Sequence, residues 1–182
     1  MIDWDKRYRD GFYDGVKKPH ELLKRFWQVI PKGRVFDIAM GSGRDAAFLA
    51  DKGFDVYGIE KSTEAIKIAG ETTKNDISII SGDAGFLPFK HNSAEGVIVF
   101  YFLLRSIMGD IINILKKGGV LVYETFLGRQ NDIDRRRNPD FLLDDGELIS
   151  YFRNFENLFY EETISTSEGK RRAIARFVGK KR

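Results

Sequence analysis

Apolar residues follow two different spacings along the first two thirds of the chain. Runs that are apolar nearly throughout, as in 96-GVIVFYF-102, are typical of strands that are covered on both faces. Between such runs, apolar residues recur at intervals of three and four, as Leu23, Phe26 and Ile30 do, which predicts helices with one buried face. Strands are expected at 34–39, 54–60, 76–81, 96–102 and 120–126, and helices at 19–30, from 44 to before 53, from 62 onward, and at 104–117.

The pattern changes after Phe126. A polar loop at 128–140 leads to a short helix near 145–154. Two further strands, 156–164 and 171–179, flank a turn and are expected to form a hairpin. Strands that alternate with helices, followed by a hairpin, predict an α/β fold with a doubly wound, mostly parallel seven-stranded sheet that ends in an antiparallel hairpin.

Length and composition limit the classes of protein and site. At 182 residues the chain is expected to form one domain, 1–182, with 1–30 as an N-terminal lid and helix segment. It has no cysteine and only two distant histidines, His20 and His91, so no metal site is expected. The N-terminus is charged and aromatic, and no run approaches the roughly 20 apolar residues of a membrane helix. We expect a cytoplasmic protein without a membrane partner.

The net charge of +3 arises largely from residues 170–182. A basic surface of this kind is one feature of nucleic-acid-binding proteins. Lysine and arginine on an edge strand also discourage edge-to-edge pairing of sheets. We favour the edge strand, so a nucleic-acid partner is not expected.

Candidate chemistry begins at 35-VFDIAMGSGRDAAFLA-50, where a strand turns into a helix. Gly41 and Gly43 lie at this turn, where the absence of Cβ atoms lets a ligand approach the backbone. The start of the helix favours a negative group, which fits a dinucleotide pyrophosphate or the carboxylate of an amino-acid-like ligand. The pattern G-x-G-x-x-A matches the dinucleotide fingerprint as well.

Two carboxylates distinguish these ligands. Glu60 closes the second strand, where an acid can accept hydrogen bonds from ribose hydroxyls. Asp37 precedes the glycines, where it would repel a pyrophosphate and attract an ammonium group. S-adenosyl-L-methionine carries adenine, ribose, a sulfonium and an ammonium, so it fits both acids. Farther along, Asp83 and the backbone N–H of Ala84 are placed to contact the adenine.

These segments resemble the class I S-adenosylmethionine-dependent methyltransferases. Within that family, 4-WDKRY-8, the G-R-D-A of the glycine loop and 123-YETF-126 are most similar to the small tellurite-resistance and thiopurine-type methyltransferases. One departure is Ala39, where many members have glycine, and we expect this change to do little harm. The resemblance implies that the cofactor is bound by Asp37, Ala39, Gly41, Gly43, Glu60, Lys61, Asp83, Ala84 and Phe100.

The resemblance also places the methyl-transfer site at the end of the fourth strand, next to Tyr101. For methyl transfer to a soft acceptor, the protein mainly has to orient the acceptor toward the methyl group and exclude water, and base catalysis is less important. A hydroxyl acceptor would need a base, for which Glu124 is the best candidate. Arg105 is placed to attract an anionic acceptor. The catalytic candidates are therefore Tyr101, Glu124 and Arg105, and Trp4 and Tyr8 are candidates for a lid over the cofactor.

The predicted function is methyl transfer from S-adenosylmethionine to a small-molecule acceptor, possibly a thiol or a chalcogen oxyanion, by a monomer or homodimer. Three alternatives stay open: a methyltransferase acting on RNA or protein, a non-catalytic S-adenosylmethionine-binding module, and an NAD(P)-dependent oxidoreductase. The last lacks a Tyr-x-x-x-Lys motif after the fourth strand.

Overall fold

A computed structural model describes residues 3–11, 13, 18–73, 77–134, 137–167 and 169–182. Its centre is a seven-stranded sheet in the order β3-β2-β1-β4-β5-β7-β6. Strands β1 to β5 are parallel, and β7 and β6 continue the sheet in antiparallel fashion. The predicted fold class is confirmed. The strands are β1 (Arg34–Ile38), β2 (Asp55–Glu60), β3 (Ser78–Ser81), β4 (Ala94–Phe100), β5 (Leu115–Phe126), β6 (Phe155–Ser167) and β7 (Lys170–Lys181).

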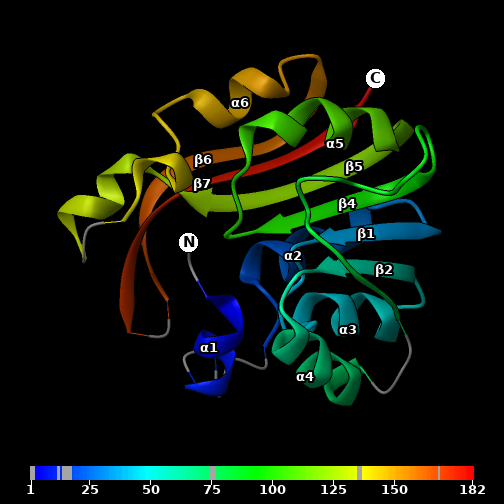
Figure 1. Cartoon of the computed structure of the whole chain (residues 1–182). Coiled ribbons are helices and arrows are strands. Elements are labelled where there is room, and N and C mark those ends of the chain that lie inside the picture. Colours follow the sequence, from blue (N-terminus) through cyan, green and yellow to red (C-terminus); the bar gives the residue numbers. More distant parts are fainter. Residues whose placement is uncertain (1–2, 12, 14–17, 74–76, 135–136, 168) are drawn as a thin grey trace.

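Helices cover both faces of this sheet (Figure 1). One face carries α2, α3 and α4, the other carries α5 and α6, and α1 lies beside α4. A separate apolar cluster lies on each face, as expected when strands are buried on both sides. The helices are α1 (Trp4–Arg9), α2 (Glu21–Phe26), α3 (Arg44–Asp51), α4 (Thr63–Thr73), α5 (Met108–Ile114) and α6 (Glu147–Tyr151), with short 3-10 turns at Trp27–Val29, Arg105–Ile107, Gly128–Asp132 and Pro139–Phe141.

The helix predicted at 104–117 ends earlier, at Ile114, and that prediction was wrong for its last turn. The amides of Asn92 and Ser93 bond the carbonyls of Asn113 and Ile114, and the Lys181 ammonium bonds those of Ile112 and Leu115. Because these partners satisfy the carbonyls that end the helix, the chain passes directly into β5.

The interpretation of 170–182 as a basic edge strand was also wrong. β7 lies between β5 and β6, and β6 is the edge. Within β7, Arg176 forms ion pairs with Glu124 of β5 and Glu161 of β6. At least one basic residue of this segment, Arg176, therefore stabilises the pairing of β7 with both neighbouring strands.

Among the described residues, no helix has the length and apolar character needed to cross a membrane.

Candidate cofactor and methyl-transfer site

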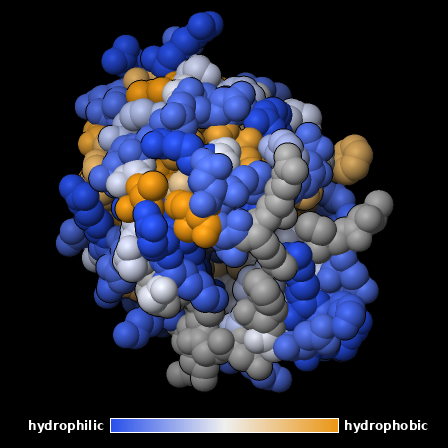
Figure 2. All heavy atoms as spheres, turned by 90° about the vertical axis from the view of Figure 1, so that its left-hand side faces the viewer, coloured by the Kyte–Doolittle hydropathy of each residue, from blue (hydrophilic) through white to orange (hydrophobic). Residues whose placement is uncertain are grey.

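The predicted cofactor residues meet at the carboxyl ends of the parallel strands. The strand order reverses between β1 and β4, and ligands of doubly wound sheets bind in the crevice at such a point. Figure 2 shows the face toward which β4 and β5 point: it is mainly hydrophilic, with apolar side chains gathered near its middle.

Asp37 is almost completely buried near the end of β1, with 3% of its surface exposed. Its Oδ2 atom is buried without a hydrogen-bond partner among the described residues. Burial raises the pKa of this carboxyl well above its ordinary value, and the nearby Asp45 and Glu60 raise it further. A buried, unpartnered acceptor is costly, so this atom is suited to a cationic ligand.

Glu60 has a role that the sequence did not indicate. Its Oε2 accepts from the amide of Gly41 at 2.9 Å, and its Oε1 accepts from Lys61 at 2.9 Å and Ser62 at 2.8 Å. The side chain therefore fixes the glycine loop to the end of β2. A carboxylate oxygen accepts more than one hydrogen bond, so contacts to ribose hydroxyls remain open to it.

The glycine loop needs its glycines. Gly41 and Gly43 have φ values of 58° and 76°, and a Cβ on Gly41 would lie 2.6 Å from the Tyr8 hydroxyl oxygen. Ala39 also has a positive φ, 57°. The expectation that alanine does little harm here needs correction, because a left-handed conformation costs an alanine roughly 1–2 kcal/mol.

The predicted adenine contacts lie one strand farther along the sheet. Asp83 accepts from Lys61 Nζ at 2.7 Å and from the amide of Gly85 at 2.9 Å, and the bond from Lys61 lowers the pKa of Asp83. Ala84, next to it, is buried. The structure thus brings Asp83 and Lys61 together as one unit beside Glu60.

An aromatic cluster borders the proposed methyl-transfer position at the end of β4. The Tyr101 ring lies 4.7 Å from that of Phe126, and the guanidinium of Arg172 lies 5.5 Å from the Tyr101 ring centre. Tyr101 has a φ of 53°, a strained value that is most frequent at functional sites. Burial, and then the charge of Glu124, raise the pKa of Tyr101, so its hydroxyl stays protonated.

Glu124 and Arg105 are both engaged with other residues. Glu124 is buried and accepts from Arg176 Nε at 2.8 Å. Arg105 donates to both carboxylate oxygens of Glu147, at 2.7 and 2.9 Å, and to the carbonyls of Asp140 and Leu142. Arg105 therefore ties the loop after β5 to the turn after β4, a structural role in place of the predicted attraction of an anionic acceptor.

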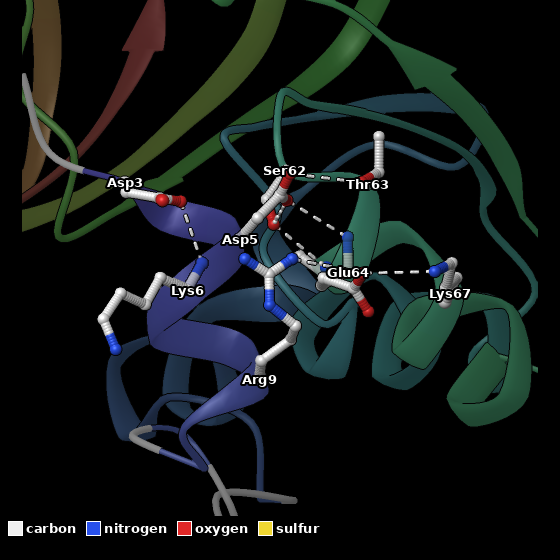
Figure 3. A network of polar contacts seen from close by, with 9 residues as sticks. Asp3, Asp5, Lys6, Arg9, Ser62, Thr63, Glu64 and Lys67 are labelled. Carbon is white, nitrogen blue, oxygen red and sulfur yellow. Dashed lines mark hydrogen bonds and ion pairs between the residues drawn. The ribbon is translucent and has the colours of Figure 1, made fainter.

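The N-terminal helix docks beside this site (Figure 3). The Asp5 carboxylate accepts from the Ser62 hydroxyl at 2.6 Å, the Thr63 hydroxyl at 3.2 Å and the Glu64 amide at 3.2 Å. It therefore caps α4 from another helix. Tyr8 lies against Gly41, and Trp4, which is 38% exposed, has the guanidinium of Arg7 over its ring. Of the expected lid segment 1–30, residues 1, 2, 12 and 14–17 lie outside the described residues.

Asp5→Asn should loosen α1, because the neutral amide removes the charge that holds three donors. Amide hydrogen exchange measured by mass spectrometry should accelerate in α1 and in the first turn of α4. The Ser62 bond lowers the pKa of Asp5, so the same loosening should appear in the unchanged protein as pH falls through that lowered pKa. Asp10→Asn, which removes only an exposed pair with Lys6, is the control. Equal exchange in both variants would contradict the role of Asp5.

A group that the sequence analysis missed lies between α3 and the end of β4. His20 bonds Asp45 through both its amide and its ring, and the ring stacks on Phe100 with centroids 4.0 Å apart. Arg44 contacts the same histidine. The sequence offered little indication of this group, because His20 lies 25 residues before Asp45. Only Arg44 and Asp45, directly after Gly43, marked the place in the sequence.

Known proteins with similar sequences and structures agree with this geometry. Residues 35–119 match the family described as "Methyltransferase domain". A demethylmenaquinone methyltransferase from Renibacterium salmoninarum is 33% identical over 102 residues, which is 53% of this chain and 43% of that protein. A thiopurine S-methyltransferase from Pseudomonas putida is 34% identical over 70 residues, 35% of this chain and 32% of that protein.

The crystal structure of TehB from Haemophilus influenzae superposes with a TM-score of 0.76 at 20% identity, over 98% of this chain and 67% of that one. The chain spans about half the length of the first curated relatives that it matches. The glycine loop with its two acids, the sheet order and these similarities all agree with a class I S-adenosylmethionine-dependent methyltransferase, and a methyltransferase domain is matched over residues 35–119 of the chain.

Proposed function

We propose that the chain transfers the methyl group of S-adenosylmethionine to a small-molecule acceptor. The observation that carries this proposal is the buried Oδ2 atom of Asp37, which has no partner among the described residues and lies beside the glycine loop. An ammonium group satisfies such an atom, whereas a pyrophosphate would be repelled by it.

The other cofactor roles follow from position. Glu60 accepts from the ribose hydroxyls while it holds Gly41. Asp83 accepts from the adenine amino group, and Ala84 donates through its backbone. When bound, the sulfonium cofactor supplies a methyl group that is already activated for displacement. The protein then has to align the acceptor and exclude water, which accounts for the aromatic rings at the end of β4.

The residues at the end of β4 fit a thiol or a chalcogen oxyanion best as the methyl acceptor. Arg172, whose guanidinium lies 5.5 Å from the centre of the Tyr101 ring, places positive charge beside the rings, whereas the charge of Arg176 is balanced by Glu124 and Glu161. Positive charge favours an anionic acceptor and stabilises a thiolate. A relative named as an S-methyltransferase agrees with a sulfur acceptor. Glu124 is proposed to hold Arg176 and Tyr101 in place, and to act as a base only for a hydroxyl acceptor.

Calorimetric titration with S-adenosylhomocysteine, followed by a screen of thiols and chalcogen oxyanions, tests the proposal. Tight binding with turnover of at least one such acceptor is expected. Binding of NADH alone would overturn it. Binding without turnover of any small molecule would favour a non-catalytic module or a macromolecular acceptor, and RNA binding that weakens steeply with salt would indicate RNA.

Tyr101→Phe should lower kcat by about 100-fold or more, because the hydroxyl that orients the acceptor is lost. Affinity for S-adenosylhomocysteine should be unchanged, since the ring and its packing remain. Steady-state kinetics and calorimetry on the same preparation separate the two effects. Tyr57→Phe, distant from this edge at the middle of β2, is the control. An unchanged kcat would remove Tyr101 from the catalytic set.

A further inference from the structure

Two arginines from separate segments stand over the aromatic pair at the end of β4. The guanidinium of Arg172, near the start of β7, lies 5.5 Å from the centre of the Tyr101 ring. The guanidinium of Arg137, in the loop after β5, lies 4.2 Å from the centre of the Phe126 ring. Because the two ring centres are only 4.7 Å apart, both positive charges border one place at the carboxyl ends of β4 and β5.

The backbone next to Arg172 is held by Gln130, a buried residue of the turn after β5. The ladder between β5 and β7 ends at Ile174, so the preceding residue of β7 lies beyond the last strand pair. The amide of Ala173 donates to Gln130 Oε1 at 2.7 Å, and the Ala173 carbonyl accepts from the Leu127 amide at 3.0 Å. Gln130 is only 1% exposed. Its side-chain amide therefore replaces a strand carbonyl and fixes β7 one residue from Arg172.

The next residue, Asn131, holds the backbone of Arg137 in a similar way. Its Oδ1 accepts from the Arg137 amide at 2.7 Å, and its Nδ2 donates to the Arg137 carbonyl at 3.3 Å. An amide side chain can donate and accept at once, so a single asparagine fixes both polar groups of that backbone. Two adjacent amides, Gln130 and Asn131, thus reach the two segments that carry the arginines.

An arginine that stacks on a ring can still bind an anion. Stacking uses the flat face of the guanidinium, whereas its N–H groups lie in the plane and point outward along it. The planar fork matches the two oxygens of a carboxylate or a similar oxyanion. The Asp134 carboxylate lies 3.3 Å from Arg137 Nη2, but this acid is half exposed, and such a pair is worth only about 0–1 kcal/mol. An anionic ligand can therefore take its place.

We propose that Arg137 and Arg172 bind a carboxylate or another oxyanion of the methyl acceptor. Gln130 and Asn131 are positioning residues that hold the two arginines beside the rings. The inference rests on the proposed function and narrows it: the acceptor is a small molecule with an anionic group in addition to the atom that receives the methyl group. The rings then contact the apolar part of the same molecule.

Two thiols of equal length test this assignment by steady-state kinetics: 3-mercaptopropionate and its neutral amide, 3-mercaptopropanamide. Transfer forms a bond from the thiol sulfur to the methyl carbon, breaks the bond from that carbon to the sulfonium, and releases S-adenosylhomocysteine and a proton. The unchanged protein should show a kcat/KM roughly 10-fold or more higher for the acid than for the amide. The difference should appear mainly in KM, because the arginines bind a group away from the reacting atom.

Arg137→Gln and Arg172→Gln should each remove most of the preference for the acid and leave S-adenosylhomocysteine affinity, measured by calorimetry, unchanged. Gln130→Met and Asn131→Ala should reduce the same preference, because each frees the backbone that carries one arginine. A purely structural role of these two amides would instead lower the turnover of both thiols equally.

Arg34→Gln, which removes an exposed arginine at the far end of β1, is the matched control and should leave the preference unchanged. A preference that persists in both arginine variants would overturn the inference. So would its absence in the unchanged protein, whether the two thiols are methylated equally or not at all, a result that needs no variant to fold. Failure of the unchanged protein to bind S-adenosylhomocysteine would instead overturn the proposed function.

Discussion

Asp37→Asn is expected to make the ligand-free protein more stable while it removes cofactor binding. The free energy of unfolding should rise by about 1–3 kcal/mol at neutral pH, because a buried carboxylate without a partner is replaced by a neutral group. For a chain of this length, each kcal/mol corresponds to roughly 2–4 °C in Tm. Affinity for S-adenosylhomocysteine should fall roughly 30-fold or more, as when one member of a buried charge pair is removed.

The stability effect should depend on pH in a defined direction. Burial raises the folded pKa of Asp37 above its unfolded value, so the folded state holds this proton more strongly. Its unfavourable contribution is absent below the unfolded pKa and grows as pH rises through the window up to the raised folded pKa. The stability gained by Asp37→Asn should therefore vanish in acid and be largest above that window.

The affinity for S-adenosylhomocysteine should also depend on the protonation of Asp37. The ammonium needs the ionised carboxylate, so affinity for S-adenosylhomocysteine should increase with pH until the raised pKa is passed. Calorimetry in two buffers of different ionisation enthalpy should show proton release on binding below that pKa. Asp55→Asn, which alters an exposed aspartate at the start of β2, should change neither Tm nor affinity appreciably. A destabilised Asp37→Asn protein that still binds tightly would refute the assignment of Asp37.

The sequence was informative where chemistry is local. Asp37 lies near the end of β1 and Glu60 ends β2, so the position of each carboxylate follows from the strand that carries it, and Gly41 and Gly43 lie in the turn directly after β1. The fold class was predictable for the same reason, since each strand and helix has its own apolar spacing.

What the sequence did not reveal depends on distant contacts. The end of α5 is set by Lys181, and the place of β7 inside the sheet is set by its pairing with β5 as well as β6. The ion pair of Arg105 with Glu147 joins residues 42 positions apart, so the sequence around Arg105 does not indicate it. The hydrogen bonds between His20 and Asp45 were not predicted, because a lone histidine before a helix has no distinguishing sequence pattern.

Glu60→Gln should have the opposite effect on stability from Asp37→Asn, although both exchanges neutralise a buried acid at the same site. Glu60 has three amide donors, from Gly41, Lys61 and Ser62. A glutamine has one acceptor oxygen, so its NH2 group must face at least one of these donors. Leaving a buried donor unsatisfied costs about 1–3 kcal/mol, and Tm should fall accordingly.

Cofactor binding should weaken for two reasons that can be separated. The carboxylate no longer accepts from the ribose hydroxyls, and the amide of Gly41 is no longer held. We expect at least about a tenfold loss of affinity for S-adenosylhomocysteine and for 5′-methylthioadenosine alike, because both carry the ribose. In Asp37→Asn, the loss should be confined to the ligand that has the ammonium. The exposed Glu71→Gln on α4 should alter neither ligand affinity nor Tm. If Glu60→Gln weakened only the amino-acid-containing ligand, Glu60 would belong to the ammonium site and the ribose assignment would be wrong.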